Sequence, residues 1–243
     1  MNKILALLLS TLFLLTLAGC QNESPDSESN VPEASNTHVV SKNAEIYLPK
    51  SPDKRLAVAA QQNKDAVAWL TIDGTTIDNA VYQSADNTYY LRRDAYGEYS
   101  LEGCYFADFE CIMDNSDSLG RNTVIYGHYF TGDEEMRFFA QLYKYVEDEE
   151  WAMDHRYIQL SVSDAMLTYE VISAGQVDAR EDKLAISASL NIDELAQLAQ
   201  DSIDRSVFDF GAESATVGSL LTLSTCTGDY STRLLVVARL VSM

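Results

Sequence analysis

The chain has 243 residues, 47% of them hydrophobic, which is enough for a large core, so it is not a small scaffold held together by disulfides. Its 17 Lys and Arg against 37 Asp and Glu give a formal net charge of −20, and no stretch gathers the basic residues that phosphate binding needs. Nucleic acid is therefore excluded as a partner. The negative charge otherwise bears on solubility and association and does not indicate a fold.

Residues 1–20 are typical of an export signal. Lys3 supplies a positive charge, residues 4–17 are mostly apolar, and the segment closes with Leu17-Ala18-Gly19-Cys20. The apolar run is shorter than the ~20 residues that span a bilayer. Its ending resembles a bacterial lipobox, so we expect a lipoprotein-type signal peptide with lipidation of Cys20. An uncleaved membrane anchor is the alternative, and both place the remaining chain on the extracytoplasmic face of a bacterial membrane.

Residues 21–48 predict a flexible tether. The segment is rich in Ser, Asn, Glu and Pro and has few large apolar side chains. Such a composition cannot bury enough surface to offset the entropy of ordering. The globular domain is therefore expected over residues 49–243.

The first half of this domain predicts one helix followed by short strands. In chain order we expect a helix around residues 56–60 that Asn63 interrupts, a turn at Asp73-Gly74, a strand over 76–82, a short helical turn over 87–92, and strands over 101–106 and 122–126. A polar loop over 114–120 separates the last two strands.

The second half adds helices to further strands. Apolar residues at helical spacing, from Met136 to Val146, predict an amphipathic helix over 133–146 that packs on a core. The later elements are a hairpin of strands over 157–162 and 166–172, a helix over 192–203 capped by Asn191 with Leu195, Leu198 and Ala199 facing inward, and strands over 220–225 and 234–241.

These elements predict a mostly β fold. Seven or eight short strands occur with a few inserted helices and without the alternation of strand and helix that builds a parallel sheet. The pattern favours a closed or nearly closed barrel or sandwich, rich in antiparallel pairs.

The globular part contains three cysteines and two histidines, namely Cys104, Cys111, Cys226, His128 and His155. No Cys-x-x-Cys or His-x-x-x-His pair is present, so no metal site is expected. No Gly-rich phosphate loop is present either, and we expect no cofactor. His155 follows an acidic run and is interpreted as a surface residue.

Cys226 is the candidate nucleophile. Six residues separate Cys104 from Cys111, and the sequence leaves open whether they form a disulfide or remain two thiols. In both cases Cys226 is unpaired, and an unpaired thiol outside the cytoplasm is a candidate for function. Leu221 and Leu223 share one face of the strand, so Cys226 belongs to the opposite, polar face.

His128 and Arg233 are expected beside this thiol. His128 follows a strand that ends in Gly127, which permits close approach of the backbone. Arg233 begins the strand after Cys226 and shares a face with Leu235, so it points toward the same cleft. A free thiol is only about 3% thiolate at pH 7, so a cationic neighbour favours its reactivity.

These residues resemble a known family, the sortases. The resemblance rests on Leu-Ser-Thr-Cys at 223–226, the strand that begins with Arg233, and Asn-Thr-Val-Ile-Tyr-Gly-His at 122–128. Residues 67–78, 86–91 and the insert that holds the 192–203 helix are similar to class B sortases in particular. The resemblance covers about residues 50–243.

The resemblance implies a closed eight-stranded β-barrel with N-terminal helices and a helix inserted in the long connection before the cysteine strand. It implies a cysteine transpeptidase, with Cys226 as nucleophile, His128 as general acid and base, and Arg233 as the cation that holds substrate and stabilises the oxyanion. It further implies that Cys226 forms a thioester with a surface protein cut at its C-terminal sorting signal. The acceptor is an amine of a peptidoglycan precursor or a pilin lysine.

Four more residues match the sorting-signal groove of class B relatives or flank the nucleophile: Asn87, Leu91, Ser224 and Thr225. Two features depart from the family. The interval from Cys226 to Arg233 is short, and a lipobox stands where a transmembrane anchor is usual. A hydrolytic cysteine peptidase and a non-catalytic, lipid-anchored protein that binds sorting signals remain the alternative hypotheses.

Overall fold

A computed structural model describes residues 50–130, 137–178, 180–213, 217–226 and 232–242. The chain divides into two units, Met1–Ala44 and Glu45–Met243, and the described residues all belong to the second. The expected signal peptide, its Cys20 and the whole of the tether lie outside the described residues. In the described residues no helix is both long and apolar enough to cross a membrane.

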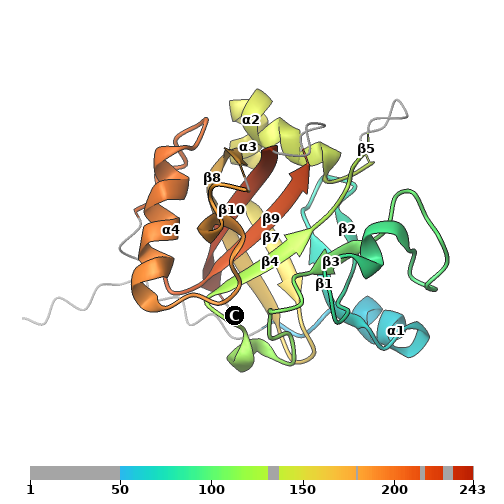
Figure 1. Cartoon of the computed structure of the whole chain (residues 1–243). Helices are drawn as coiled ribbons and strands as arrows, with labels where there is room; N and C mark the ends of the chain where they lie inside the picture. Colours follow the sequence, from blue (N-terminus) through green and yellow to red (C-terminus); the bar gives the residue numbers. More distant parts are fainter. Residues whose placement is uncertain (1–49, 131–136, 179, 214–216, 227–231, 243) are drawn as a thin grey trace, which may run out of the picture. The chain divides into compact units, whose positions relative to one another are not determined.

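Eight strands close into a barrel in the order β1-β2-β3-β4-β9-β10-β8-β7 (Figure 1). The bounds of these strands are β1 Ala66–Thr71, β2 Asp78–Tyr82, β3 Tyr105–Ala107, β4 Asn122–Tyr126, β7 Tyr157–Ser161, β8 Met166–Asp178, β9 Leu220–Cys226 and β10 Thr232–Ser242. The predicted fold class, a closed eight-stranded barrel of mostly β structure, is confirmed.

Two neighbouring pairs in the barrel are parallel, β2 with β3 and β4 with β9, and the others are antiparallel. A parallel pair needs a long crossover between its strands. The crossover from β2 to β3 carries the 3₁₀ helix η1, Tyr89–Arg92, and the crossover from β4 to β9 carries most of the remaining elements. Both crossovers therefore contribute segments near the ends of β3 and β4.

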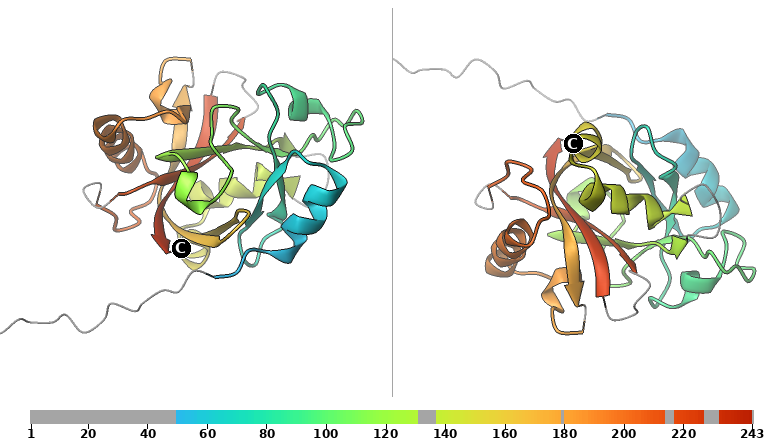
Figure 2. Two further views of the ribbon diagram at one scale, coloured as in Figure 1. Left: turned by 90° about the horizontal axis from the view of Figure 1, so that it is seen from below. Right: turned by 90° about the horizontal axis from the view of Figure 1, so that it is seen from above.

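The strands β9 and β10 are buried on both faces. Leu221, Leu223 and Val236 belong to the cluster inside the barrel, whereas Leu220 and Leu235 belong to a second cluster that includes the inward face of α4. The helices α1, Lys54–Gln62, and α4, Ile192–Asp204, lie on opposite sides of the barrel (Figures 1 and 2).

Local capping explains why α4 forms where it does. The side chain of Asn191 accepts hydrogen bonds from the backbone N–H groups of Asp193 and Glu194, and the Glu194 carboxylate accepts one from the Asn191 N–H. This capping box satisfies donors that the first turn leaves free. The predicted inward residues, Leu195, Leu198 and Ala199, are all buried, so the prediction for this helix is confirmed.

The single helix predicted over 133–146 is wrong in its described part. Residues 137–147 instead form a short strand, a 3₁₀ helix and one helical turn: β6 Arg137–Phe138, which pairs with β5 Tyr129–Phe130, then η3 Phe139–Tyr143 and α2 Lys144–Glu147. Phe138 has φ of 53°, a left-handed conformation that an α-helix does not contain. A further helix, α3 Glu149–Asp154, was not predicted and is capped by Asp148.

The strand predicted over 101–106 is also shorter than expected, because β3 begins at Tyr105. Gly103 has φ of 61°, and a Cβ atom there would lie 2.5 Å from the Tyr90 carbonyl oxygen and 2.8 Å from that of Leu91. Only glycine allows this approach. The chain before β3 is therefore packed against η1 and cannot extend as a strand.

Helix α1 is fixed to the barrel by Arg55. Its guanidinium binds the carboxylates of Asp53 and Asp78 and lies 4.5 Å over the Trp69 ring. Asp53 also caps the helix, accepting a hydrogen bond from the Arg55 N–H at 2.8 Å, and Asn63 ends the helix as predicted.

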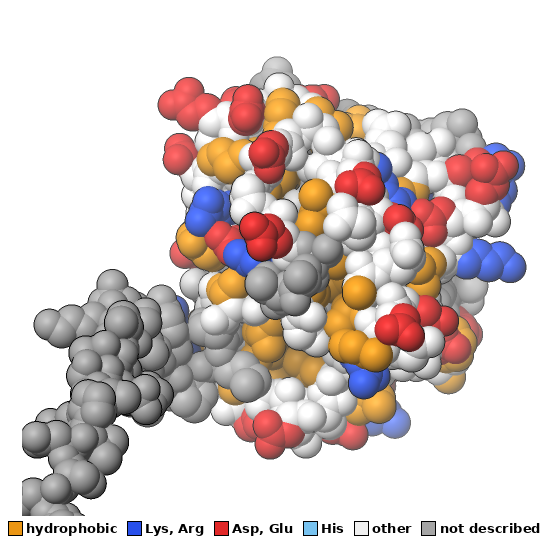
Figure 3. Space-filling model, turned by 90° about the vertical axis from the view of Figure 1, so that its left-hand side faces the viewer, with side chains coloured by type: hydrophobic (Ala, Val, Ile, Leu, Met, Phe, Trp, Pro, Cys, Tyr) orange, Lys and Arg blue, Asp and Glu red, His pale blue; other side chains and the backbone are white. Residues whose placement is uncertain are grey.

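On the side of α4, acidic side chains are spread over the surface among uncharged ones (Figure 3).

Candidate active site

The parallel pairing of β4 with β9 brings His128 and Cys226 to the same end of the barrel. The last paired residues are Tyr126 and Ser224, and the N–H of Gly127 donates to the Ser224 carbonyl at 3.2 Å. His128 and Cys226 each lie two residues beyond that pair. Residues at equal distance along parallel neighbours reach the same level of the sheet.

The antiparallel pairing of β9 with β10 adds Arg233 to this end, because Cys226 and Arg233 are register partners. Three adjacent strands, β4, β9 and β10, thus bring together the three residues predicted for catalysis (Figure 1). The side chain of Cys226 and the turn at 227–231 lie outside what the structure describes. The roles predicted for the three residues stay predictions.

Gly127 fixes the path of the chain into His128. A Cβ atom at this position would lie 2.7 Å from two ring carbons of Phe139 and 2.9 Å from Tyr105 Cδ1. The N–H of Phe139 in turn donates to the carbonyl of His128 at 3.2 Å. The close backbone approach that the sequence suggested for Gly127 is present, and it holds His128 against η3.

The His128 imidazole is half-buried and contacts η1. Its Nε2 atom lies 2.6 Å from the Leu91 carbonyl oxygen and 3.0 Å from Nη1 of Arg92. Burial lowers the pKa of His128, the Leu91 carbonyl raises it, and the Arg92 guanidinium lowers it, with a net lowering. The surroundings of the ring therefore favour the neutral imidazole over the imidazolium.

Arg233 lies over the Tyr126 ring, with its guanidinium carbon 5.7 Å from the ring centroid. The Tyr126 hydroxyl donates to Oδ2 of Asp108 at 2.8 Å. Burial and the Asp108 carboxylate together raise the pKa of Tyr126, so the phenol stays protonated and keeps donating this bond. Tyr126 thus links the arginine to a buried carboxylate.

Asp108 is only 5% exposed and also holds Asn87, one of the expected substrate contacts. The Asn87 Nδ2 donates to Oδ2 of Asp108 at 2.7 Å, and the N–H of Phe109 donates to Asn87 Oδ1 at 3.0 Å. Sequence reasoning missed Asp108. The available signal was an acidic residue directly after the apolar strand β3.

The other three expected substrate contacts differ in exposure. Leu91 is 37% exposed beside His128, as a contact residue requires. Ser224 and Thr225 are 0% exposed, and their hydroxyls have no hydrogen-bond partner in the part of the chain that the structure describes. Of the four expected contacts, Leu91 and Asn87 are therefore at least partly exposed, whereas Ser224 and Thr225 are buried.

Cys104 and Cys111 are both free thiols, so the disulfide that the sequence left open is not formed. Burial raises the pKa of each thiol to about 12. Cys111 accepts a hydrogen bond at Sγ from the N–H of Val124. Both are core residues, and the described residues hold no cluster of three or more His, Cys, Asp or Glu side chains suited to a metal.

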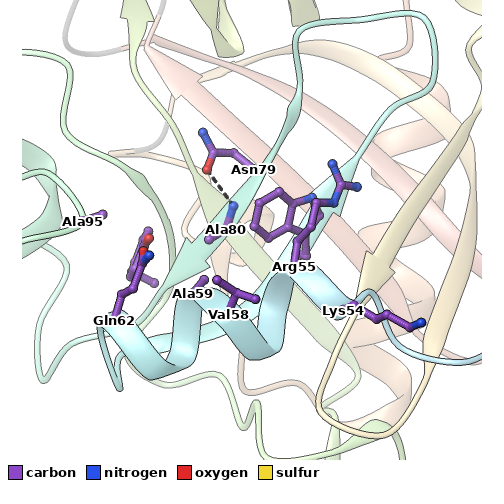
Figure 4. A pocket seen from close by; sticks show the side chains of 10 residues that line it. Lys54, Arg55, Val58, Ala59, Gln62, Asn79, Ala80 and Ala95 are labelled. Carbon is purple, nitrogen blue, oxygen red and sulfur yellow. Dashed lines mark hydrogen bonds between the residues drawn. The ribbon is translucent and has the colours of Figure 1, made fainter.

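A hollow of about 460 Å³ lies between α1 and strands β1 and β2 (Figure 4). Its lining includes the apolar side chains of Val58, Ala59 and Trp69, with Lys54 and Arg55 on the helix side. None of the residues predicted for catalysis or substrate binding lines it. It is therefore separate from the candidate active site.

Comparison with known proteins gives a consistent result. A family model described as a sortase domain matches residues 70–241. Sortase B of Listeria monocytogenes is 30% identical over 165 residues, which are 68% of this chain and 63% of that protein, just under two thirds of its length. Sortase B of Staphylococcus aureus is 28% identical over 184 residues, covering 74% and 72%.

Solved structures agree with these matches. A Staphylococcus aureus sortase B–substrate complex superposes with a TM-score of 0.68 at 25% sequence identity. The superposition covers 79% of this chain and 87% of that one. The similarity therefore extends over most of both chains.

Proposed function

The chain belongs to the sortase family, in its class B, and we propose that it works as a cysteine transpeptidase on exported surface proteins. The observation that supports this proposal is the strand register: Cys226 ends β9 opposite Arg233 of β10, and His128 follows the end of β4, the strand on the other side of β9. A thiol, a proton carrier and a fixed cation are the groups that acyl transfer requires.

In the proposed first step the Cys226 thiolate attacks the carbonyl carbon of the scissile peptide bond. The S–C bond forms, the C–N bond breaks, and His128 gives a proton to the departing amine. The Arg233 guanidinium donates to the carbonyl oxygen as negative charge develops there. The product is a thioester between Cys226 and the surface protein.

In the second step an acceptor amine attacks the thioester and gives up a proton to His128, a new amide forms, and the S–C bond breaks to restore the thiolate. The family resemblance points to an amine of a peptidoglycan precursor or a pilin lysine as the acceptor. The first substrate is a C-terminal sorting signal, in keeping with the substrate complex solved for the Staphylococcus aureus relative. Asn87 and Leu91, which border His128 and Asp108, are the proposed contacts for that peptide.

For location we propose attachment to the extracytoplasmic face of a bacterial membrane through lipid on Cys20. The proposal rests on the lipobox-like sequence before that residue. A single acyl chain gives only weak binding, so stable attachment needs the two or three chains of a bacterial lipoprotein.

The test is incubation with a library of sorting-signal peptides, with and without an added amine, read by mass spectrometry. A transpeptidase gives a thioester adduct on Cys226 and, with the amine, an amide product, and both are lost in Cys226→Ala. Product that is hydrolysed equally in the presence of amine would instead identify a cysteine peptidase. Peptide binding without any cleavage would identify a non-catalytic binding protein.

A further inference from the structure

The Nε2 atom of His128 lies within hydrogen-bond distance of two groups of η1 that differ in their hydrogen-bonding role. Nε2 lies 2.6 Å from the carbonyl oxygen of Leu91 and 3.0 Å from Nη1 of Arg92. A carbonyl oxygen only accepts hydrogen bonds, and a guanidinium only donates them. A single ring nitrogen therefore cannot satisfy both neighbours at once.

Each protonation state of His128 leaves one contact unfavourable. A proton on Nε2 suits the Leu91 carbonyl but faces an N–H of Arg92, whereas a bare Nε2 suits Arg92 but faces the carbonyl lone pairs. The imidazolium would place two positive charges next to each other. Like charges at this separation disfavour the charged ring, even with the screening that water provides at an exposed arginine.

The position of Arg92 is fixed by its own loop. Nη1 of Arg92 also donates to the Leu101 carbonyl at 2.6 Å, and the Arg92 carbonyl accepts from the N–H of Ser100 at 3.1 Å. The neighbouring Arg93 points elsewhere. Its guanidinium lies 4.7 Å over the Tyr89 ring and donates to the Gly97 carbonyl at 3.3 Å. Of two consecutive arginines, one contacts the imidazole.

Besides Arg92, charged or titratable groups stand on the elements around His128. They include Glu102 before β3, Tyr105 in β3, Tyr126 in β4, Tyr129 in β5, Tyr143 in η3, Cys226 at the end of β9 and Arg233 on β10. Among the described side chains, Arg92 is the charged one that contacts the ring, and it contributes to the lowered pKa of His128 after burial. The effect of the Arg92 contact on protonation of the ring can therefore be tested apart from the summed effect of the other charges near the site.

We propose that Arg92 is a positioning residue for His128: its guanidinium holds the Nε2 edge of the ring at η1 and disfavours the imidazolium until a bound peptide draws the two apart. The consequence for catalysis rests on the proposed function, since His128 must carry a proton to the leaving amine. Leu91, an expected peptide contact, is adjacent to Arg92 in η1. Occupation of η1 by a sorting signal is thus coupled to protonation of the catalytic imidazole.

The experiment is an NMR titration of the full chain with ¹³C-labelled histidine. The His128 signal is assigned by its loss in His128→Gln, which leaves the signals of His38 and His155. In Arg92→Gln we expect the pKa of His128 to rise by roughly 0.7 of a pH unit, about fivefold in proton affinity, from Coulomb's law in water. Arg92→Lys keeps the charge and is expected to stay within 0.3 of a unit, roughly, of the unmodified protein.

Arg93→Gln is the matched control, because it removes the same charge one residue away from a side chain that does not contact the ring. It is expected to leave the His128 titration unchanged. An unchanged or lowered pKa in Arg92→Gln would overturn the proposal, as would an equal rise in Arg93→Gln. The titration needs no substrate, so it tests Arg92 even if the protein shows no transpeptidase activity, and absence of activity would count against the proposed function alone.

A kinetic measurement examines the coupling to catalysis. In Arg92→Gln the limb of the kcat/KM pH profile that belongs to His128 should move toward higher pH by the same interval as the NMR titration. A loss of kcat/KM with no shift along the pH axis would show a purely structural role and would contradict the proposal. Circular dichroism of each variant checks that it is folded.

Discussion

Cys226 lies directly opposite Arg233 where β9 pairs with β10. The same strand β9 runs parallel to β4, so its end is also level with His128. The relative placement of these three residues thus depends on strand register, and a barrel fixes register because each strand is paired on both sides.

The first prediction concerns the nucleophile. Cys226→Ala should abolish both cleavage of a sorting-signal peptide and formation of the thioester adduct, because the two thiols that the structure describes, Cys104 and Cys111, are buried. The fold should remain intact, since the other residues of β9 keep their ladder with β10. Mass spectrometry and thermal unfolding check the two parts. Cleavage at the unmodified rate in this variant would refute the assignment.

The second prediction concerns Arg233. Arg233→Ala should lower kcat/KM by roughly 10²–10³-fold, as removal of an oxyanion donor does in other acyl-transfer enzymes. Steady-state kinetics over peptide concentration measure the change. Arg239→Ala is the control on the same strand, because that arginine binds Glu170 at the other end of β10. An equal loss in both variants would show that only strand stability had been affected.

The third prediction concerns the buried carboxylate. Oδ2 of Asp108 accepts from both Asn87 and Tyr126, and Oδ1 accepts from the Glu110 N–H. An amide offers one acceptor oxygen, so Asp108→Asn forces an N–H against at least one donor. We expect a loss of about 1–3 kcal/mol in unfolding free energy and a several-fold rise in KM for the sorting-signal peptide.

Asp164→Asn is the matched control for this change. The Asp164 carboxylate also accepts hydrogen bonds at both of its oxygens, from the N–H and hydroxyl of Ser116, but on an exposed turn. Its kinetics should be unchanged. If Asp108→Asn changes stability but leaves KM as it was, the carboxylate supports only the fold and does not hold Asn87 for substrate.

The sequence predicted those parts of the fold that local patterns determine. Strand β4 and helix α4 begin where predicted, because their signals are local in the sequence. These signals are an apolar run for β4 and the Asn191 cap for α4. The prediction of a helix over 133–146 is wrong in the described part because the surrounding structure imposes the left-handed conformation of Phe138 and its pairing with Tyr129.

The site shows the same division. Cys226 ends β9, Arg233 lies near the start of β10 and His128 follows β4, so strand alternation and family motifs could single them out as candidates. Asp108 and Arg92 act through partners 18 and 36 residues away along the chain, Tyr126 and His128. No sequence periodicity predicts a contact of this kind. Asp108 and Arg92 can be recognised as parts of the site only from the folded structure.

The fourth prediction uses the two buried thiols. Cys104 and Cys111 are 8% and 9% exposed, and burial raises the pKa of each to about 12. At pH 8 only about one in ten thousand of such thiols is ionised, and the thiolate is the reactive form. Iodoacetamide should therefore label neither residue in the folded protein, whereas it labels Cys226. Peptide mapping identifies the labelled sites, and rapid modification of Cys104 or Cys111 before unfolding would contradict their burial.

The fifth prediction tests the approach of the backbone at Gly127. In Gly127→Ala the new methyl group would lie 2.7 Å from Phe139 and 2.9 Å from Tyr105, whose rings stack at 4.6 Å in the core. Neither ring is at the free end of a flexible chain, so the strand must shift. We expect a loss of about 1–3 kcal/mol in unfolding free energy from overpacking, and a larger proportional loss of kcat/KM because His128 is the next residue.

Gly218→Ala is the matched control, because a Cβ atom at Gly218 meets nothing within 4 Å. This variant should be as stable as the unmodified protein or slightly more stable, since alanine reduces the entropy of the unfolded chain. Denaturant unfolding and peptide kinetics on the two variants measure both effects. If Gly127→Ala is destabilised yet retains full kcat/KM, then the position of His128 does not depend on the packing of Gly127 against Phe139, and the imidazole must be held mainly by its contacts with η1.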